Sequence, residues 1–204
     1  MIKRLVIIGA GGHGKVCANI AFRMNQWEEI VFLDDKQKTS VFHFEVIGKL
    51  DFSLIQETDE VFVAIGDNQL RSSLIHKLQK SNFKLAKLID PSAVIGLGVI
   101  IGSASVIMPN VVINADAYIG QGVILNSSSI IEHDCEIEDF VHISPNATIG
   151  GGSHISAYSW VGIGATVIQS IKFTNHVIIG AGSTVTKDIN DSGVYVGCPV
   201  RKIS

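Results

Sequence analysis

From Ile89 to Val185, an aliphatic or aromatic residue stands at every sixth position without interruption. The position four residues further on is also restricted, because it carries alanine, serine or valine with two exceptions, Cys135 and Ile171. A six-residue period fits neither an α-helix nor a simple alternating strand. It is typical of a parallel β-helix, in which each hexad forms one short strand and one corner. We expect the large residue and the small one, the first and fifth of each hexad, to point inward.

Glycine often follows the large residue of a hexad. Because glycine tolerates conformations that other residues avoid, we expect the backbone to bend sharply at these positions. They are Gly96, Gly102, Gly120, Gly150, Gly162 and Gly180.

Several outward positions of the repeat are apolar. They include Ile124, Ile130, Phe140 and Trp160, which is more apolar surface than a solitary coil should leave in water. A closed three-fold ring would bury such faces, so we expect a homotrimer.

The first part of the chain has a different pattern, in which short apolar strands alternate with helical segments. The pattern predicts strands at residues 5–8, 30–33, 60–65 and 83–89, and helices at 15–25 and 69–80. Strands and helices that alternate at this spacing favour a small α/β domain with a parallel sheet. Pro91 suits the entry to the first coil, since a helix cannot continue through it. We therefore expect a Rossmann-like domain over residues 1–85 and a β-helix over 86–204.

A glycine-rich loop, Gly9-Ala10-Gly11-Gly12-His13-Gly14, follows the first strand. It matches the dinucleotide-binding fingerprint, in which free backbone N–H groups and a helix N-terminus bind a diphosphate. Asp34 and Asp35 end the next strand, where they could bind ribose hydroxyls or a base N–H, and His13 could contact a phosphate or sugar. So short a domain supplies one mononucleotide-binding half, which predicts one nucleotide with a diphosphate rather than NAD. The alternative is a glycine turn needed only for tight packing.

The segment Glu132-His133-Asp134 places an imidazole between two carboxylates. His133 is third in its hexad, so it should lie on the exterior. An adjacent carboxylate raises the basicity of an imidazole and fixes its tautomer, as a general base requires. His142, sixth in the next hexad, should also lie outside. The alternative is that His133 is merely a solvated surface residue, which is how we interpret His43, His76, His154 and His176.

Composition indicates which binding partners and which cellular compartment we expect. A formal net charge of −3 without a basic stripe argues against nucleic acid or a membrane surface. The apolar run at the N-terminus is too short for a signal peptide, and no membrane span follows. Cys17, Cys135 and Cys198 are scattered, and Cys135 falls on an inward position, which favours a reduced, cytoplasmic protein.

The combination of motifs resembles the PglD-type acetyltransferases of bacillosamine-like sugar biosynthesis, within the sialic acid O-acetyltransferase-like hexapeptide family. The resemblance rests on the glycine loop, residues 32–35, 64–68 and 126–135, and the ending at 193–199. It implies a left-handed coil, a homotrimer with active sites at subunit interfaces, acetyl-CoA as donor and a UDP-linked 4-amino-4,6-dideoxy sugar as acceptor.

The same resemblance assigns roles to individual residues. It makes His133 the general base and Asp134 the carboxylate that orients it, although the family often has glutamate there and Glu132 could take over. Gly11 and Gly12 would lie at the diphosphate, with His13, Asp34 and Asp35 around the nucleotide sugar. The residues that would line the acetyl-CoA channel are Asn126, His142, Gly151, Ile163, Gly180 and Ala181.

The expected reaction is direct transfer of the acetyl group to the sugar amine, with a backbone N–H or His142 supporting the oxyanion. No metal is implied. O-acetylation of sialic acid or another polysaccharide sugar is the alternative within the same class. Some coils of this type are zinc carbonic anhydrases, but they need a His-x₄-His pair, and the histidines at 133, 142, 154 and 176 lack that spacing. A scaffolding protein would leave Glu132-His133-Asp134 unexplained.

Overall fold

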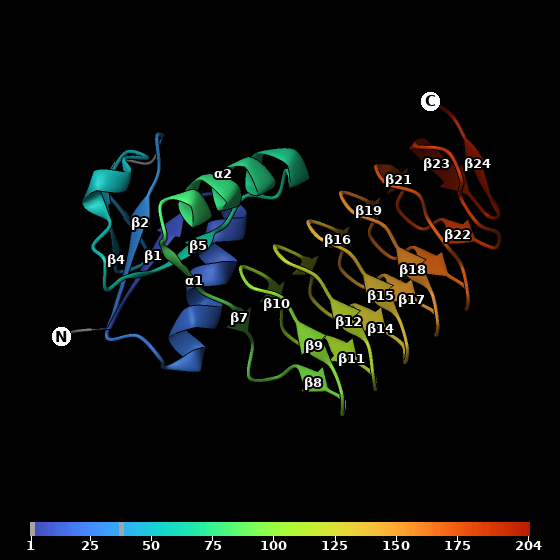
Figure 1. Ribbon diagram of the computed structural model, residues 1–204, viewed down its shortest axis with the longest axis horizontal. Coiled ribbons are helices and arrows are strands. Elements are labelled where there is room, and N and C mark those ends of the chain that lie inside the picture. Colours follow the sequence, from blue (N-terminus) through green and yellow to red (C-terminus); the bar gives the residue numbers. More distant parts are fainter. Residues whose placement is uncertain (1–2, 37–38) are drawn as a thin grey trace. The chain divides into compact units, whose positions relative to one another are not determined.

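The computed structural model describes residues 3–36 and 39–204. The chain forms two compact units, Met1–Pro91 and Ser92–Ser204. The first contains both α-helices of the described residues, and the second consists of short parallel strands wound into coils, with one antiparallel pair at its end (Figure 1). The expected α/β domain and the parallel β-helix are therefore confirmed.

The first unit is built on a six-stranded sheet with the order β3-β4-β2-β1-β5-β6. All of its neighbouring strands run parallel except the β3–β4 hairpin, which the sequence pattern did not predict. The carboxyl ends of β1, β2 and β5 therefore meet at one edge of the sheet, where a ligand binds in such folds. The elements are β1 (Arg4–Ile8), α1 (Gly12–Met24), β2 (Glu29–Leu33), β3 (Ser40–Val41), β4 (Phe44–Gly48), a 3₁₀ turn (Phe52–Leu54), β5 (Glu60–Val63), α2 (Asn68–Lys80), β6 (Lys84–Leu85) and β7 (Leu88–Ile89).

Helix α1 begins at Gly12 rather than at residue 15, so the predicted start was wrong. The end of the glycine loop is thus already helical, and the backbone N–H groups of the first turn lie next to the strand ends. A β-carbon on Gly14 would collide with the carbonyl oxygen of Gly9. Glycine at position 14 is therefore what lets the helix start this close to β1.

The second unit repeats every eighteen residues, because each strand pairs with the strand one coil further along. Its three faces are the ladders β10-β13-β16-β19-β21-β23-β24, β8-β11-β14-β17-β20-β22 and β9-β12-β15-β18. The strands are β8 (Val94–Ile95), β9 (Ile100–Ile101), β10 (Val106–Ile107), β11 (Val112–Ile113), β12 (Tyr118–Ile119), β13 (Ile124–Leu125), β14 (Ile130–Ile131), β15 (Glu136–Ile137), β16 (His142–Ile143), β17 (Thr148–Ile149), β18 (His154–Ile155), β19 (Trp160–Val161), β20 (Thr166–Val167), β21 (Val177–Ile179), β22 (Thr184–Val185), β23 (Gly193–Gly197) and β24 (Val200–Lys202).

The interior follows the hexad register. From Ile107 to Val185, the first residue of every hexad is buried. The small fifth residue is buried as well. Where it is serine its hydroxyl bonds to the backbone, except at Ser129, whose buried Oγ has no hydrogen-bond partner among the described residues. Ser105 Oγ donates to the carbonyl of Gly120 at 2.8 Å and accepts the N–H of Val123 at 2.9 Å. The coil interior is therefore filled, and most of its serine hydroxyls are hydrogen-bonded.

The glycines that follow each large residue do not form the corners, so the expectation that the backbone bends sharply at them was wrong. The left-handed conformation recurs every six residues, at the fourth hexad position, from Gly98 to Gly182, whereas the glycines of the second position do not adopt it. A β-carbon on Gly150 would lie 2.5 Å from the backbone nitrogen of Gln169 in the next coil. These glycines are needed for close stacking of the coils, not for the bend.

Two of the apolar residues expected on the exterior are in fact buried. Ile124 pairs with Val106 and His142 of the adjacent coils and is 1% exposed, and Phe140, 2% exposed, stacks on Tyr158 with ring centroids 5.4 Å apart. Trp160 remains 46% exposed.

Candidate functional site

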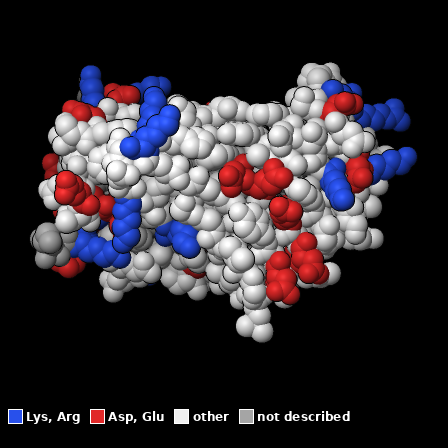
Figure 2. Space-filling model, in the orientation of Figure 1, with Lys and Arg blue, Asp and Glu red and all other residues white. Residues whose placement is uncertain are grey.

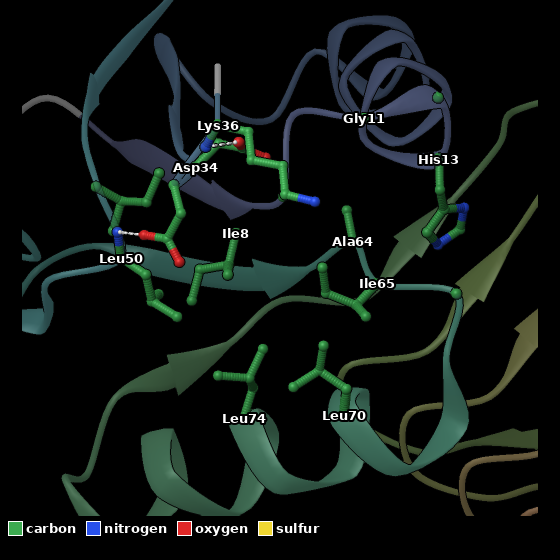
Figure 3. Close-up of a pocket in the computed structure, with 15 residues that line it drawn as sticks. Ile8, Gly11, His13, Asp34, Lys36, Leu50, Ala64, Ile65, Leu70 and Leu74 are labelled. Carbon is green, nitrogen blue, oxygen red and sulfur yellow. Dashed lines mark hydrogen bonds between the residues drawn. The ribbon is translucent and has the colours of Figure 1, made fainter. Parts of the chain in front are cut away.

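A pocket of about 490 Å³ opens at the carboxyl ends of β1, β2 and β5. All five residues expected at the nucleotide sugar line it, and Figure 3 shows His13, from the start of α1, and Asp34, from the end of β2, around the same hollow. The aliphatic side chains of Leu70 and Leu74 from α2 form its floor. The pocket thus combines an apolar floor with polar groups on its rim. The five expected residues are Gly11, Gly12, His13, Asp34 and Asp35.

The two aspartates hold the pocket together as well as facing it. Asp34 Oδ2 accepts the backbone N–H of Ala10 at 2.7 Å, and its Oδ1 accepts that of Lys36, also at 2.7 Å. Asp35 Oδ1 accepts the N–H of Leu50 at 3.0 Å. Asp34 therefore fixes the glycine loop to the end of β2, a role that the sequence pattern did not indicate.

His13 is neutral at physiological pH. Burial, and to a smaller extent the positive charge of Arg71, lower its pKa to about 4. His13 Nε2 lies 3.7 Å from the Sγ atom of Cys17, one turn along α1. An uncharged imidazole can donate or accept a hydrogen bond but cannot supply positive charge to a diphosphate.

Lys36 is a pocket residue that the sequence analysis missed. Figure 3 shows its side chain extending over the pocket from the end of β2. The sequence could have indicated it, because Lys36 directly follows Asp34 and Asp35 and so lies close to the end of β2. Arg71, also missed, lies buried behind the same pocket.

In the second unit, His133 and Asp134 form an exposed pair on a corner of the β-helix. His133 Nδ1 and Asp134 Oδ2 are 2.7 Å apart, and their side chains are 63% and 65% exposed. Because an ionised carboxylate can only accept, Nδ1 carries the hydrogen and Nε2 keeps a lone pair. The hydrogen bond to Asp134, together with the negative charges of Asp134 and Glu132, raises the pKa of His133. This is the arrangement that a general base needs.

The two carboxylates beside His133 have different partners. Glu132 Oε2 accepts a hydrogen bond at 2.9 Å from Nδ2 of Asn114, in the previous coil. Asp134 adopts the left-handed corner conformation, with φ of 57°, and bonds to the imidazole. The geometry therefore favours Asp134 as the orienting carboxylate.

Gly151 lies directly beside the ring of His133, one coil further along. A β-carbon at Gly151 would be 2.7 Å from Nε2 and 2.9 Å from Cε1 of His133. The absence of a side chain at Gly151 thus leaves room at the nitrogen that would accept a proton.

Asn126 and His142 lie on another part of the β-helix. Asn126 Oδ1 accepts the N–H of Ser127 at 2.8 Å, which turns its Nδ2 toward His142 Nε2 at 3.3 Å. His142 therefore accepts at Nε2 and carries its hydrogen at Nδ1. Its ring stacks on Trp160 with an interplanar angle of 6° and centroids 5.6 Å apart, so the imidazole is held flat on this face.

The remaining residues expected at the donor occupy the corner that Asn126 begins. Ile163 is 59% exposed, and Ala181, eighteen positions later, is also exposed. A β-carbon on Gly180 would lie 2.7 Å from Cγ1 of Val196 in β23, so glycine allows the last coil to pack closely there.

The expected acetyl-CoA residues are thus divided between two corners of the coil. Residues eighteen apart stack on one corner, as shown by the bonds from Gly152 N to His133 O and from Gly164 N to Pro145 O. Gly151 shares the corner of His133, whereas Asn126, Ile163, Gly180 and Ala181 belong to the preceding corner and His142 to the face beside it. Within one chain the structure does not bring these two groups together.

His154 has acidic neighbours that the sequence analysis overlooked. Its Nε2 is 2.5 Å from Glu138 Oε1, and its Nδ1 is 3.6 Å from Glu136 Oε2. The signal was the eighteen-residue spacing of Glu136 and His154, which pairs them in adjacent coils. Glu138 also accepts the N–H of Ala157 at 2.8 Å. The three side chains form a polar cluster that spans two adjacent coils.

Charged side chains are dispersed over the face of the molecule that Figure 2 draws. On the face drawn in Figure 2, basic and acidic side chains form small separate groups with broad uncharged areas between them. Neither α1 nor α2, the α-helices of the described residues, is long and apolar enough to cross a membrane.

The fold defines a hexapeptide-repeat transferase with an N-terminal α/β domain. Residues 4–78 match the model of the PglD N-terminal domain, and residues 116–151 match that of the bacterial transferase hexapeptide (six repeats). The chain belongs to the PglD-type acetyltransferase family.

Three relatives illustrate this membership. Over 117 residues the chain is 37% identical to UDP-N-acetylbacillosamine N-acetyltransferase of Bacillus subtilis (strain 168), a match that spans 52% of each protein and thus about half the length of this curated relative. It is 38% identical to the acetyltransferase domain of PglB from Neisseria gonorrhoeae FA1090 in complex with acetyl coenzyme A, with a TM-score of 0.96 and full coverage of both chains. A variant of perosamine N-acetyltransferase from Caulobacter crescentus, in complex with CoA and GDP-perosamine, is 32% identical, with a TM-score of 0.94 and coverage of 100% and 98%.

Proposed function

We propose that this protein transfers the acetyl group of acetyl-CoA to the 4-amino group of a UDP-linked 4-amino-4,6-dideoxy sugar. The observation that carries the proposal is the His133–Asp134 pair, 2.7 Å apart on an exposed corner, with Gly151 leaving space at Nε2. An N-acetyltransferase needs a base so placed, because the amine must lose a proton as it attacks.

The relatives support both substrates. One is bound to acetyl coenzyme A, another to CoA and GDP-perosamine, and a third is named for UDP-N-acetylbacillosamine. The pocket beside the glycine loop of this chain suits a nucleotide diphosphate, since it carries N–H groups at a helix N-terminus and aspartates at the end of β2. We choose UDP over GDP from the motif resemblance at residues 126–135 and 193–199.

The mechanism that follows is direct transfer. The sugar amine attacks the thioester carbonyl while Nε2 of His133 takes its proton, and the C–S bond then breaks to release CoA as the thiolate. Asp134 holds Nδ1–H and stabilises the imidazolium that forms. His142, which carries its hydrogen at Nδ1, or a backbone N–H supports the oxyanion. Thiolate is a good leaving group, so no acyl-enzyme and no metal are required.

We further propose a homotrimer in which each active site lies between two subunits. The support is the division of the expected donor residues, because Gly151 lies with His133 while Asn126 lies one corner earlier and His142 on the face beside that corner. A neighbouring copy could bring its Asn126 corner to the His133 corner of the first, and a three-fold ring closes such heterologous contacts. Trp160, 46% exposed beside His142, is an apolar side chain that such a contact would cover.

We place the reaction in the cytoplasm, where acetyl-CoA is available. The three cysteines, Cys17, Cys135 and Cys198, are all free, as is usual in a reducing compartment.

The decisive experiment measures CoA release over a panel of UDP-4-amino sugars, GDP-4-amino sugars and sialic acids. We expect turnover with a UDP-4-amino sugar and an N-acetylated product by mass spectrometry. Preference for a sialic acid, with an O-acetyl product, would replace the proposal by the alternative reaction. His133→Ala, tested on the same panel, separates enzymatic from spontaneous release.

A further inference from the structure

Arg71 lies in the first turn of α2 and is only 1% exposed. A buried guanidinium is costly unless its N–H groups are hydrogen-bonded. Nη1 donates to the carbonyl oxygens of Ile65 at 3.1 Å and Gly66 at 3.0 Å, and Nη2 donates to Oδ1 of Asn68 at 2.7 Å. Burial lowers the pKa of Arg71 to about 10, so the side chain stays charged at neutral pH. A cation is thus fixed behind the loop that joins β5 to α2.

The carbonyl contacts of Arg71 also determine where the neighbouring N–H groups point. In a trans peptide the C=O and the N–H point in opposite directions. Because the carbonyls of Ile65 and Gly66 face Arg71, the N–H groups of Gly66 and Asp67 point away from it. Ile65 and Gly66 line the pocket, and a β-carbon on Gly66 would meet nothing within 4 Å, so this wall is open.

Two successive N–H groups that point the same way form a concavity that favours anions. They lie at the N-terminus of α2, which spans 13 residues and adds a partial positive charge. The glycine loop at the end of β1 contributes donors from a different strand end. A diphosphate in the pocket would therefore have donors on two walls.

We propose that Arg71 is a positioning residue for the acceptor, which aims the backbone N–H groups of Gly66 and Asp67 at the diphosphate of the nucleotide sugar. The inference rests on the proposed function, and it adds a residue that acts on the ligand without touching it. Arg71 also accounts for the state of His13. Burial of His13 is the main cause of the low pKa of that imidazole, and the charge of Arg71 is the second cause. The positive potential of this wall therefore comes from Arg71 and not from His13.

The test compares Arg71→Lys with Arg71→Met. Lysine keeps the charge but lacks the planar fork that holds two carbonyls and Asn68 together, whereas methionine removes both. We expect each variant to raise KM for the nucleotide amino sugar, and Kd for UDP alone, by about 10- to 100-fold, the worth of a charged hydrogen bond. The kcat at saturation and KM for acetyl-CoA should stay within about twofold, which a general loss of structure would not allow.

NMR titration of His13 gives a second measurement that needs no substrate. The pKa of His13 should stay low in Arg71→Lys and rise in Arg71→Met. If methionine prevents folding, the lysine variant still decides the question through Kd for UDP. Wild-type affinity for UDP in a folded Arg71→Lys, or an unchanged pKa of His13 in a folded Arg71→Met, would overturn the inference.

Arg23→Met is the matched control. Arg23 Nη1 bonds to Asp90 Oδ2 at 2.7 Å in the same unit but does not line the pocket. This variant should lower the melting temperature without changing Kd for UDP. If the wild type acetylates no nucleotide amino sugar, the proposed function fails, while UDP binding and the titration of His13 still decide the role of Arg71.

Discussion

A β-carbon on Gly151 would lie 2.7 Å from Nε2 of His133, so the glycine of one coil determines the space around the imidazole of the previous coil. We expect Gly151→Ala to displace the His133 ring and to reduce kcat by about tenfold or more, because small misplacements of a base are costly. Steady-state CoA release measures the loss. Gln169→Ala, one coil further along the same corner, should keep full activity. Full activity of Gly151→Ala would show that the ring has room to move.

His133→Ala should reduce turnover by about 10²–10⁴, the usual worth of positioned proton transfer. Its melting temperature should barely change, since the side chain is 63% exposed and lies outside the filled interior. Differential scanning calorimetry and CoA-release kinetics test the two halves of this prediction. A variant that keeps most of its turnover would exclude His133 as the base.

Asp134→Asn should shift the acid limb of the pH–rate profile to lower pH. The aspartate raises the pKa of His133 mainly through its hydrogen bond, so its removal lowers that pKa and leaves more neutral imidazole in acid. Because asparagine also tolerates the left-handed corner, the fold should remain intact. The rate at the plateau should still fall, since Nδ1–H loses its anionic partner. NMR titration of His133 separates its pKa from that of the substrate amine.

Glu132→Gln is the matched test for the other carboxylate. Glu132 bonds to Asn114, and its charge affects His133 only at a distance. Glu132→Gln should therefore lower the pKa of His133 less than Asp134→Asn does. A larger loss of activity in Glu132→Gln would mean that Glu132, not Asp134, orients the base.

Asp34→Ala and Asp35→Ala should both raise KM for the nucleotide sugar while leaving that for acetyl-CoA nearly unchanged. Asp34→Ala should also lower the melting temperature, because it frees the N–H groups of Ala10 and Lys36 that its carboxylate now accepts. The double variant should raise KM for the nucleotide sugar by about tenfold or more. Equal acceptor kinetics in the double variant and the wild type would place the nucleotide elsewhere.

Mixing two variants that each lose activity tests the shared active site. His133→Ala and His142→Ala change residues on different parts of the coil, and in a mixed trimer some interfaces would pair an intact His133 with an intact His142. Refolded or co-expressed mixtures should regain a fraction of wild-type turnover that neither parent has. No recovery in verified mixed trimers would place each active site within one chain.

The hexad period was sufficient to predict the β-helix, since a residue such as Ile143 can be buried only if the chain turns every six positions. The glycine loop likewise predicted the strand-to-helix turn at residues 9–14. Sequence spacing could not reveal the double role of Asp34, because its bond to Ala10 depends on how β1 and β2 align. Sequence spacing did not reveal the role of Arg71, because a cationic residue on a helix is usually exposed. It also did not reveal the partner of Glu132, because that partner, Asn114, lies one coil earlier and is placed by the stacking of the coils.

The stacking of corners every eighteen residues limits how proteins of this build can change in length during evolution. Loss of a single residue would turn every later inward side chain to the surface, so such a change between Ile107 and Val185 should be lethal to folding. Gain or loss of a whole coil preserves the alignment of every remaining corner. Beyond Gly151 and Gln169, entire coils could therefore be added to lengthen the β-helix while the geometry around His133 stays the same.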